Sequence, residues 1–236
     1  DDGGCIYLED IQPTFDGYTY DITWIGNQVW FAENLRTTVY ANGDEVPTAL
    51  SDAEWTATSS GASAIYGEGT SDCSDVSPFD ACDDEAQSLA TYGRLYNMHA
   101  VLDERNVCPS GWHVSTKNDW EELEQYVNDL VPQDYYGDYY SAVVLKTTEG
   151  WHCTATNNFN GGNGTNELGF SALPAGERRG PNGNFAEAGK RADFWTSTAY
   201  GAGCHAMRLS ACDIELDWSS GFSQFGFSVR CVWDGE

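Results

Sequence analysis

Cysteine and histidine lie close together at three places in this sequence, and both residue types can bind metals or take part in covalent catalysis. The three places are the segment from Cys108 to His113, the pair His152 and Cys153, and the pair Cys204 and His205. Thiolate and imidazole groups are the usual ligands of zinc. A cysteine nucleophile needs a free thiol and a base that activates it. Both kinds of site therefore depend on whether the cysteines remain reduced.

The number and spacing of the cysteines favour disulfides instead. The chain has eight cysteines and no Cys-x-x-Cys pair of the kind found in zinc knuckles or thioredoxin-like sites. They are Cys5, Cys73, Cys82, Cys108, Cys153, Cys204, Cys212 and Cys231. An even number at scattered positions is typical of an oxidising compartment and leaves no obvious free thiol. We therefore expect no catalytic cysteine and no zinc site, and we expect the four histidines to be structural or surface residues.

The sequence also indicates where the protein is located. The chain opens with "DDGGC", which is typical of a processed mature end, so we expect a signal peptide to have been removed. Asn163 begins an Asn-Gly-Thr acceptor motif and is a candidate glycosylation site. No run of about 18 apolar residues predicts a membrane span. These features predict an extracellular protein or one on the outer cell surface.

A net charge of −26 limits the partners and suggests one possible ion. Such a surface repels nucleic acids and anionic membranes. It suits a divalent cation, and calcium binds about six to eight oxygen atoms. The candidate ligands, in and beside one short loop, are Asp72, Asp75, Asp80, Asp83, Asp84 and Glu85. The alternative is an acidic loop that faces solvent, so we expect no required cofactor and treat structural calcium as a candidate.

Other catalytic signatures are missing from the sequence. No Gly-x-Ser-x-Gly nucleophile motif and no phosphate-binding loop occurs. With 37 acidic residues, some pair of carboxylates will lie at glycosidase spacing by chance, so such pairs are not diagnostic. The alternation of Asp213, Glu215 and Asp217 predicts the polar face of a strand.

Several local patterns predict the elements that must position any site. Alternating residues over 18–31, with Gly26-Asn27 as a type II′ turn, predict a hairpin. Ser51 and Glu54 have the spacing of a capping box before a short helix. Thr116 and Asp119 repeat that pattern before a longer helix, which Pro132 ends. The apolar residues of this helix recur at helical spacing and are Trp120, Leu123, Val127 and Leu130.

The rest of the chain divides into loops, short elements and strands. We expect a strand or turn up to Tyr96, followed by a helix through about Leu102, and a short strand or helix end over residues 141–146. Residues 58–85 and 151–193 are rich in small polar residues without a regular period, so they predict long ordered loops. Strands are predicted for "ADFWTSTAY", "CHAMRLS" and "GFSVRCVW" near the end of the chain.

Six blocks of sequence, in order, carry a family resemblance. They are "IGNQVWFAENLR", "TYGRLYNMHAV", "VCPSGWHVSTKNDWEELE", "LGFSALPAGERRGPNGNF", "ADFWTSTAY" and "GFSVRCV". The chain resembles the Fibrobacter major paralogous domain, a bacterial extracellular family similar in fold to C-type lectins. The resemblance implies a disulfide-braced α+β fold with two main helices packed on antiparallel sheets and long ordered loops. The expected domain covers residues 22–236, after an N-terminal arm and first strand at 1–21.

The resemblance also implies a disulfide between Cys108 and Cys231, which makes the segment around His113 part of the fold's framework. A bridge between Cys73 and Cys82 would close one long loop. We expect Cys204 to pair with Cys212, which leaves Cys5 with Cys153 by elimination. Eight cysteines allow on the order of 100 pairings, so these last two pairs are the least constrained.

The chain departs from sugar-binding C-type lectins at their calcium motifs. The corresponding strand reads Phe194-Trp195-Thr196-Ser197-Thr198 and lacks the acidic and amide ligands. Calcium-dependent sugar binding is therefore not carried over. The candidate ligand-binding residues, in or near the presumed loop face, are Asn158, Asn160, Arg178, Arg179, Asn182, Tyr200 and Trp218. Aromatic and amide side chains of this kind suit sugars or protein surfaces.

We predict a non-enzymatic, exported surface protein that acts by binding or adhesion through the loop region 151–193. Its partners would be extracellular proteins, glycans or other copies of itself. The first alternative is a subunit that assembles into an extracellular filament or surface layer, with the arm pairing to a neighbour's sheet edge. The second alternative is a polysaccharide-active enzyme.

Overall fold

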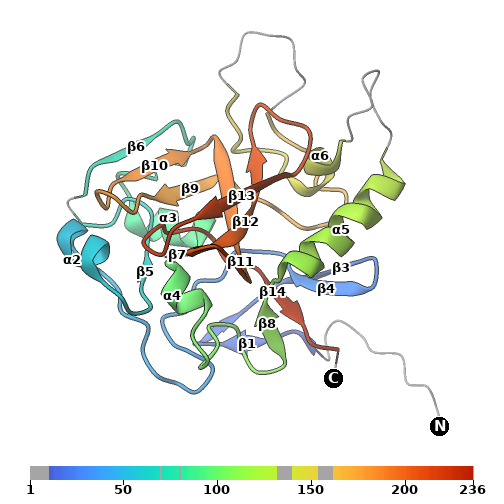
Figure 1. Cartoon of the computed structure of the whole chain (residues 1–236). Coiled ribbons are helices and arrows are strands. Elements are labelled where there is room, and N and C mark those ends of the chain that lie inside the picture. The colour runs from blue at the N-terminus through green and yellow to red at the C-terminus, as the bar shows by residue number, and fades with distance from the viewer. Residues whose placement is uncertain (1–10, 70, 80, 132–139, 154–161, 236) are drawn as a thin grey trace.

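The computed structural model of the chain describes residues 11–69, 71–79, 81–131, 140–153 and 162–235 (Figure 1). The fold is mixed α and β, and strands make up more of it than helices. The helices are α2 (Asp52–Ala57), α3 (Glu85–Tyr92), α4 (Met98–Val101), α5 (Lys117–Leu130) and α6 (Ser141–Leu145). Within the described ranges, none of the helices combines the length and apolar character that a membrane crossing requires.

The first sheet contains the predicted hairpin. Its strand order is β3 (Ile22–Ile25), β4 (Gln28–Phe31), β14 (Cys231–Trp233) and β8 (Trp112–Val114), and all pairs are antiparallel. Gly26 has a φ of 62°, as the predicted turn requires. Residues 226–230 do not continue β14 as predicted, although Phe227 and Ser228 form isolated bridges to other segments.

The second sheet has six strands and is mixed. Its order is β13 (Asp217–Gly221), β12 (Gly203–Ser210), β11 (Arg191–Tyr200), β9 (Ala175–Arg178), β10 (Phe185–Ala188) and β6 (Cys73–Asp75). The predicted strands over residues 192–200 and 204–210 are confirmed. The expectation of antiparallel sheets is wrong here, because β11 pairs with β9 in parallel and β10 pairs with β6 in parallel.

The expectation of a continuous loop over residues 151–193 is also wrong, because β9 and β10 lie within it. Strand β9 reads Ala-Gly-Glu-Arg, and all four residues are buried. Because a strand buried on both faces needs no alternation of polar and apolar residues, its sequence did not predict a strand. Asp213 and Glu215 precede β13, and only Asp217 of the predicted polar face lies in a strand. Two further pairs complete the strands, β1 (Thr14–Phe15) with β2 (Tyr18–Thr19) and β5 (Ser63–Ala64) with β7 (Leu95–Tyr96).

Helix α5 packs beside strands β11 and β12 of the six-stranded sheet (Figure 1). Thr116 and Asp119 form both hydrogen bonds of the predicted capping box. Trp120, Leu123 and Val127 are buried against Phe194 and Met207, among other core residues. The fourth residue of the predicted apolar face, Leu130, is 56% exposed, because it lies in the last turn, beyond the edge of this core.

The short helices follow the local predictions closely. Ser51 and Glu54 form the predicted capping box of α2, whose Trp55 is fully buried. β7 and α4 match the predicted strand and helix around residues 95–102, and residues 141–145 form helix α6. Helix α3 was not predicted, because its apolar residues show only a weak helical period.

Candidate functional site

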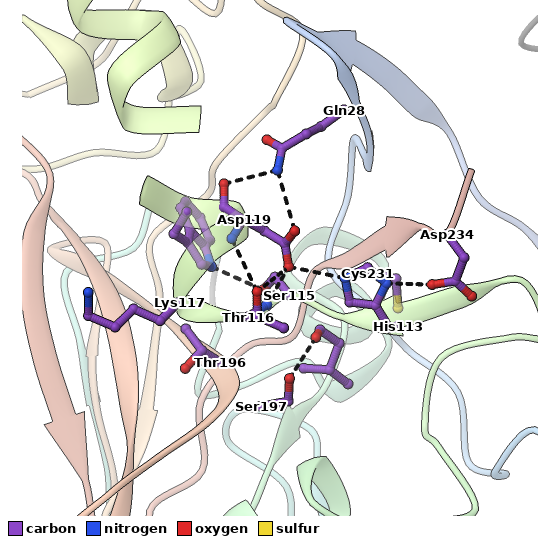
Figure 2. Close-up of polar contacts among 12 residues, drawn as sticks. Gln28, His113, Ser115, Thr116, Lys117, Asp119, Thr196, Ser197, Cys231 and Asp234 are labelled. Atoms are coloured by element: carbon purple, nitrogen blue, oxygen red, sulfur yellow. Dashed lines mark hydrogen bonds and ion pairs between the residues drawn. The ribbon is translucent and has the colours of Figure 1, made fainter. Parts of the chain in front are cut away.

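The residues around His113 lie together at the start of α5 (Figure 2). The ring of His113 lies between two carboxylates. Its Nε2 is 3.0 Å from Asp119 Oδ2, and its Nδ1 is 2.5 Å from Asp234 Oδ1. Asp119 also accepts hydrogen bonds from the backbone nitrogen and the hydroxyl of Thr116 at 2.7 and 2.6 Å. The histidine thus joins strand β8, the start of α5 and the C-terminal segment.

This geometry makes His113 a clamp and leaves it unsuited to catalysis or metal binding. Both of its ring nitrogens are engaged by carboxylates, so neither is available to activate a hydroxyl or to bind zinc. Cys108 forms a disulfide with Cys231 and offers no thiolate. The hydrogen bond with Asp119 raises the pKa of His113, and burial only partly opposes this effect. The predicted framework role of this segment fits the contacts of both residues.

Replacement of His113 by glutamine is expected to remove a pH-dependent part of the stability. A raised pKa in the folded state stabilises the protein below the unfolded value of about 6.5. This contribution is lost as the pH rises through the folded-state pKa. Because the side chain is 36% exposed, solvent screening limits the effect to on the order of 0.5 kcal/mol. Urea unfolding of both proteins between pH 5.5 and 8.5 measures it.

The other three histidines are present in both proteins, so the difference between the two unfolding free energies isolates His113. That difference should shrink as the pH rises. A difference that is constant with pH, or one that grows, contradicts the clamp.

Two of the four expected disulfides are confirmed. The described residues contain the bridges Cys73–Cys82, Cys108–Cys231 and Cys153–Cys212. The third bridge shows that the expected pairs Cys204–Cys212 and Cys5–Cys153 are wrong. Cys5 itself lies outside the described residues.

Cys204 on β12 is fully buried and forms no disulfide with another described residue. It lies near the start of β12, whereas Cys212 lies in the loop after the end of this strand. The extended strand therefore separates the two cysteines. Burial raises the pKa of Cys204 to about 11. The thiol therefore stays protonated near neutral pH and is a poor nucleophile.

In the described part of the structure, the predicted calcium ligands do not lie together in one cluster. Their carboxylates accept hydrogen bonds from elsewhere in the chain: Asp72 from Asn184, Asp75 from Cys82, Asp84 from Gln87 and Glu85 from Gly69. Among described residues, the one grouping of three possible metal ligands joins Asp75 to Cys73 and Cys82, whose sulfurs form a disulfide. Asp83 is exposed, and Asp80 lies outside the described residues. Calcium binding stays a prediction.

Arg178 does not lie on an open loop face. It is fully buried in β9, where it pairs with Glu68 at 3.1 Å and Asp52 at 3.4 Å and packs on the ring of Trp55. Its role is to hold other side chains in place. Arg178 was predicted in or near a loop face because residues 151–193 show no regular period, which left strand β9 unrecognised.

The other predicted ligand-binding residues of the loop region are scattered. Arg179 is 45% exposed and pairs with Glu177 and Glu187. Asn182 is exposed in the turn between β9 and β10, where it accepts a hydrogen bond from the backbone nitrogen of Asn184. Asn163, the candidate glycosylation site, is exposed, and its side-chain oxygen accepts a hydrogen bond from the backbone nitrogen of Trp151. Asn158 and Asn160 lie outside the described residues.

Tyr200 and Trp218, in contrast, belong to one cluster of aromatic rings. The ring of His205 lies between them, 4.5 Å from the ring of Tyr200 and 5.8 Å from that of Trp218. Lys117 Nζ lies 5.0 Å from the centre of the Trp218 ring and pairs with Glu121. Tyr200 is 57% exposed, and the others are partly exposed. We call Tyr200, His205, Trp218 and Lys117 the aromatic platform.

The register of three neighbouring strands produces the aromatic platform. Tyr200 ends β11, His205 lies near the start of β12, and Trp218 lies in β13. Two of the rings have small strand neighbours, because Tyr200 pairs with Gly203 and His205 pairs with Ser220. Trp218 pairs with the buried Met207 and packs against the core, which holds its ring in place. The backbone nitrogen of Lys117 donates to Thr198 Oγ1 at 2.9 Å, which fixes the start of α5 beside the rings.

Sequence reasoning missed two of the four platform residues. His205 was expected to be a structural or surface residue among paired cysteines, and Lys117 was given no role. No alternation along β12 could have indicated His205, because Cys204, Ala206 and Met207 around it are all buried. Figure 2 shows Lys117 directed away from the His113 clamp, at the same end of α5.

The two larger sheets, the three disulfides among the described residues and a set of partly exposed rings define a disulfide-braced α+β fold with a candidate contact surface. The chain belongs to the family described as the Fibrobacter succinogenes major domain, whose model matches residues 24–233. The match includes all three disulfides and the aromatic platform, and it confirms the family resemblance. No curated protein and no solved structure matches the chain.

Proposed function

We propose that this protein is an exported module that binds extracellular glycans by contact through the aromatic platform. The observation that carries the proposal is the series of three rings across three adjacent strands. The faces of aromatic rings are electron-rich and attract the C–H groups on the flat side of a sugar ring. Lys117 of the platform and its ion-pair partner Glu121 can form hydrogen bonds with the sugar hydroxyls.

Export is supported by the three disulfides, which persist in oxidising compartments. Rigidity supports binding by contact, because a surface fixed on strands loses little conformational entropy when a ligand associates. A C-type-lectin-like arrangement of the two sheets and the loops is part of the same proposal. Binding would not use the calcium motifs of sugar-binding lectins, which the strand at residues 194–198 lacks.

Replacement of Tyr200 or Trp218 by alanine is expected to weaken glycan binding roughly tenfold, which corresponds to about 1.4 kcal/mol. The loss follows from removal of one stacking ring, and the double replacement should abolish detectable binding. Pull-down of the purified protein by insoluble cellulose, xylan and chitin, at several protein concentrations, measures the affinity. Replacement of Tyr126 by alanine is the matched control, because this tyrosine of α5 is also exposed (38%) but lies outside the platform.

Two outcomes contradict the proposal. The first is equal binding by the double variant and the wild type. The second is turnover of a polysaccharide that one side-chain replacement abolishes, which would establish the enzyme alternative. Fibres seen by electron microscopy, together with no binding to any of the three polysaccharides, would favour the filament alternative instead.

A further inference from the structure

The three rings of the aromatic platform do not lie in one plane. The ring planes of Tyr200 and His205 are tilted by 40°, and those of His205 and Trp218 by 74°. Because these two angles differ strongly, the rings of Tyr200 and Trp218 are not parallel to each other either. A sugar stacks when its flat side lies along the face of an aromatic ring. A flat partner can therefore stack on only one of the three rings.

The tilt follows from the strands that carry the rings. Adjacent strands of a sheet are rotated relative to one another by about 20–25° on average. The register of β11 with β12 also shifts within residues 195–199, just before Tyr200, and such an irregularity increases the local twist. The ring of His205 contacts both of its neighbours, and Lys117 Nζ lies over the ring of Trp218. Rotation of the rings into one plane would break these contacts.

This tilt favours one of the two forms in which a polysaccharide occurs. At the face of a crystalline particle, the sugar rings lie in one plane, so one aromatic ring would stack and the others would meet the surface edge-on. In a separate chain, the bonds between sugars rotate, so successive units can turn toward differently tilted rings. The ring centres are 4.5 and 5.8 Å apart, which is on the scale of one sugar unit. Several weak contacts with one chain then reinforce each other.

Carboxylates outnumber the cationic group at the border of the platform. Glu121 pairs with Lys117, and both side chains are partly exposed. Burial raises the pKa of Glu124, and the nearby carboxylates of Glu215 and Glu121 raise it further. Three acids therefore lie near one ammonium group, in a chain whose net charge is −26. A ligand that carries carboxylate or sulfate groups would be repelled.

We propose that the aromatic platform selects a separate polysaccharide chain without acidic groups, and not the flat face of a crystalline particle. This inference rests on the proposed function and specifies its ligand. The tilted rings determine the preference for a separate chain. The carboxylates beside Lys117 determine the preference against acidic chains.

The first test compares microcrystalline cellulose with the same cellulose swollen in phosphoric acid, because the two share one chemistry and differ in crystallinity. Binding isotherms give the dissociation constant for each form, and swelling, which increases the accessible area, affects mainly the capacity. The wild type should bind the swollen form at least roughly tenfold more tightly. Replacement of Tyr200 or Trp218 by alanine should weaken binding to the swollen form, and Tyr126→Ala, outside the platform, should not.

The second test compares hydroxyethyl cellulose and arabinoxylan, which are uncharged soluble chains, with carboxymethyl cellulose. Affinity gel electrophoresis at low salt should show retardation by an uncharged chain and weaker retardation by the acidic one. Replacement of Glu121 by glutamine should reduce the difference roughly two- to fivefold. The matched control is Glu122→Gln, because this exposed residue of α5 lies beside Tyr126 and outside the platform.

The outcomes separate this inference from the proposed function. Binding to microcrystalline cellulose that is as tight as binding to the swollen form, and that depends on Tyr200 and Trp218, would overturn the inference alone. Equal retardation by carboxymethyl and hydroxyethyl cellulose would also overturn it. Absence of binding to every uncharged chain, or binding that persists in the folded double variant of Tyr200 and Trp218, would overturn the proposed function as well.

Discussion

Replacement of Arg230 by leucine is expected to lower the free energy of unfolding by about 3–5 kcal/mol. Arg230 is fully buried, and burial lowers its pKa to about 9. Its guanidinium donates to Asn34 Oδ1 at 2.8 Å and to the carbonyls of Phe31, Phe170 and Ser171 at 2.8, 2.6 and 3.0 Å. Leucine would leave these four buried acceptors without a donor.

The position of Arg230 explains why the loss should be global. The acceptors belong to β4, to its following segment and to residues 170–171, so one side chain joins three parts of the chain. The guanidinium also lies 4.5 Å from the ring of Phe170 and 5.4 Å from that of Phe194. Such cation–π contacts add up to about 2 kcal/mol when they are desolvated.

Replacement of Arg179 by leucine is the matched control. This arginine pairs with two carboxylates but is 45% exposed, so its removal should cost less than about 1 kcal/mol. Guanidinium chloride unfolding at neutral pH measures both variants. A cost at Arg230 no greater than that at Arg179 would show that the buried network does not stabilise the fold.

Removal of the Cys108–Cys231 bridge is expected to lower the free energy of unfolding by roughly 4–5 kcal/mol in the chain-entropy model. The two cysteines are 123 residues apart, so the bridge restricts a large part of the unfolded chain. It also ties strand β14 to the segment just before β8, within the four-stranded sheet. The experiment replaces both cysteines by alanine and compares unfolding curves under oxidising conditions.

The matched variant removes the Cys73–Cys82 bridge in the same way. These cysteines are only nine residues apart, so the same model gives roughly 2–3 kcal/mol. The order of the two losses is therefore the critical result. If the short bridge contributes as much as the long one, local strain or packing, and not restriction of the unfolded chain, accounts for the stabilisation.

The elements that the sequence predicted well are those encoded by neighbouring residues. Thr116 and Asp119 identified the start of α5, and Gly26-Asn27 identified the turn of the hairpin. In each case, the hydrogen bonds or the turn geometry join residues within a few positions of one another. The regular period of Trp120, Leu123 and Val127 gave the buried face of α5, because residues three or four apart share one face of a helix.

The candidate site was predicted only in part. Tyr200 and Trp218 were identified as exposed aromatic residues suited to binding, but the sequence did not show that they lie near each other. His205 joins them only because β12 lies between β11 and β13. Arg178 was predicted to face a ligand, yet it is fully buried in β9. Its partners Glu68 and Asp52 are more than 100 residues away in the sequence.

By itself, the sequence determined the family, the mixed α and β character and two of the three disulfides among the described residues. Each of these followed from local patterns or from blocks of residues in a fixed order. The tertiary structure alone decided the Cys153–Cys212 pairing, the burial of Arg178 and Arg230, and the assembly of the platform. These features depend on which distant segments pair, and that choice is made by the packing of the whole core, which a local pattern does not contain.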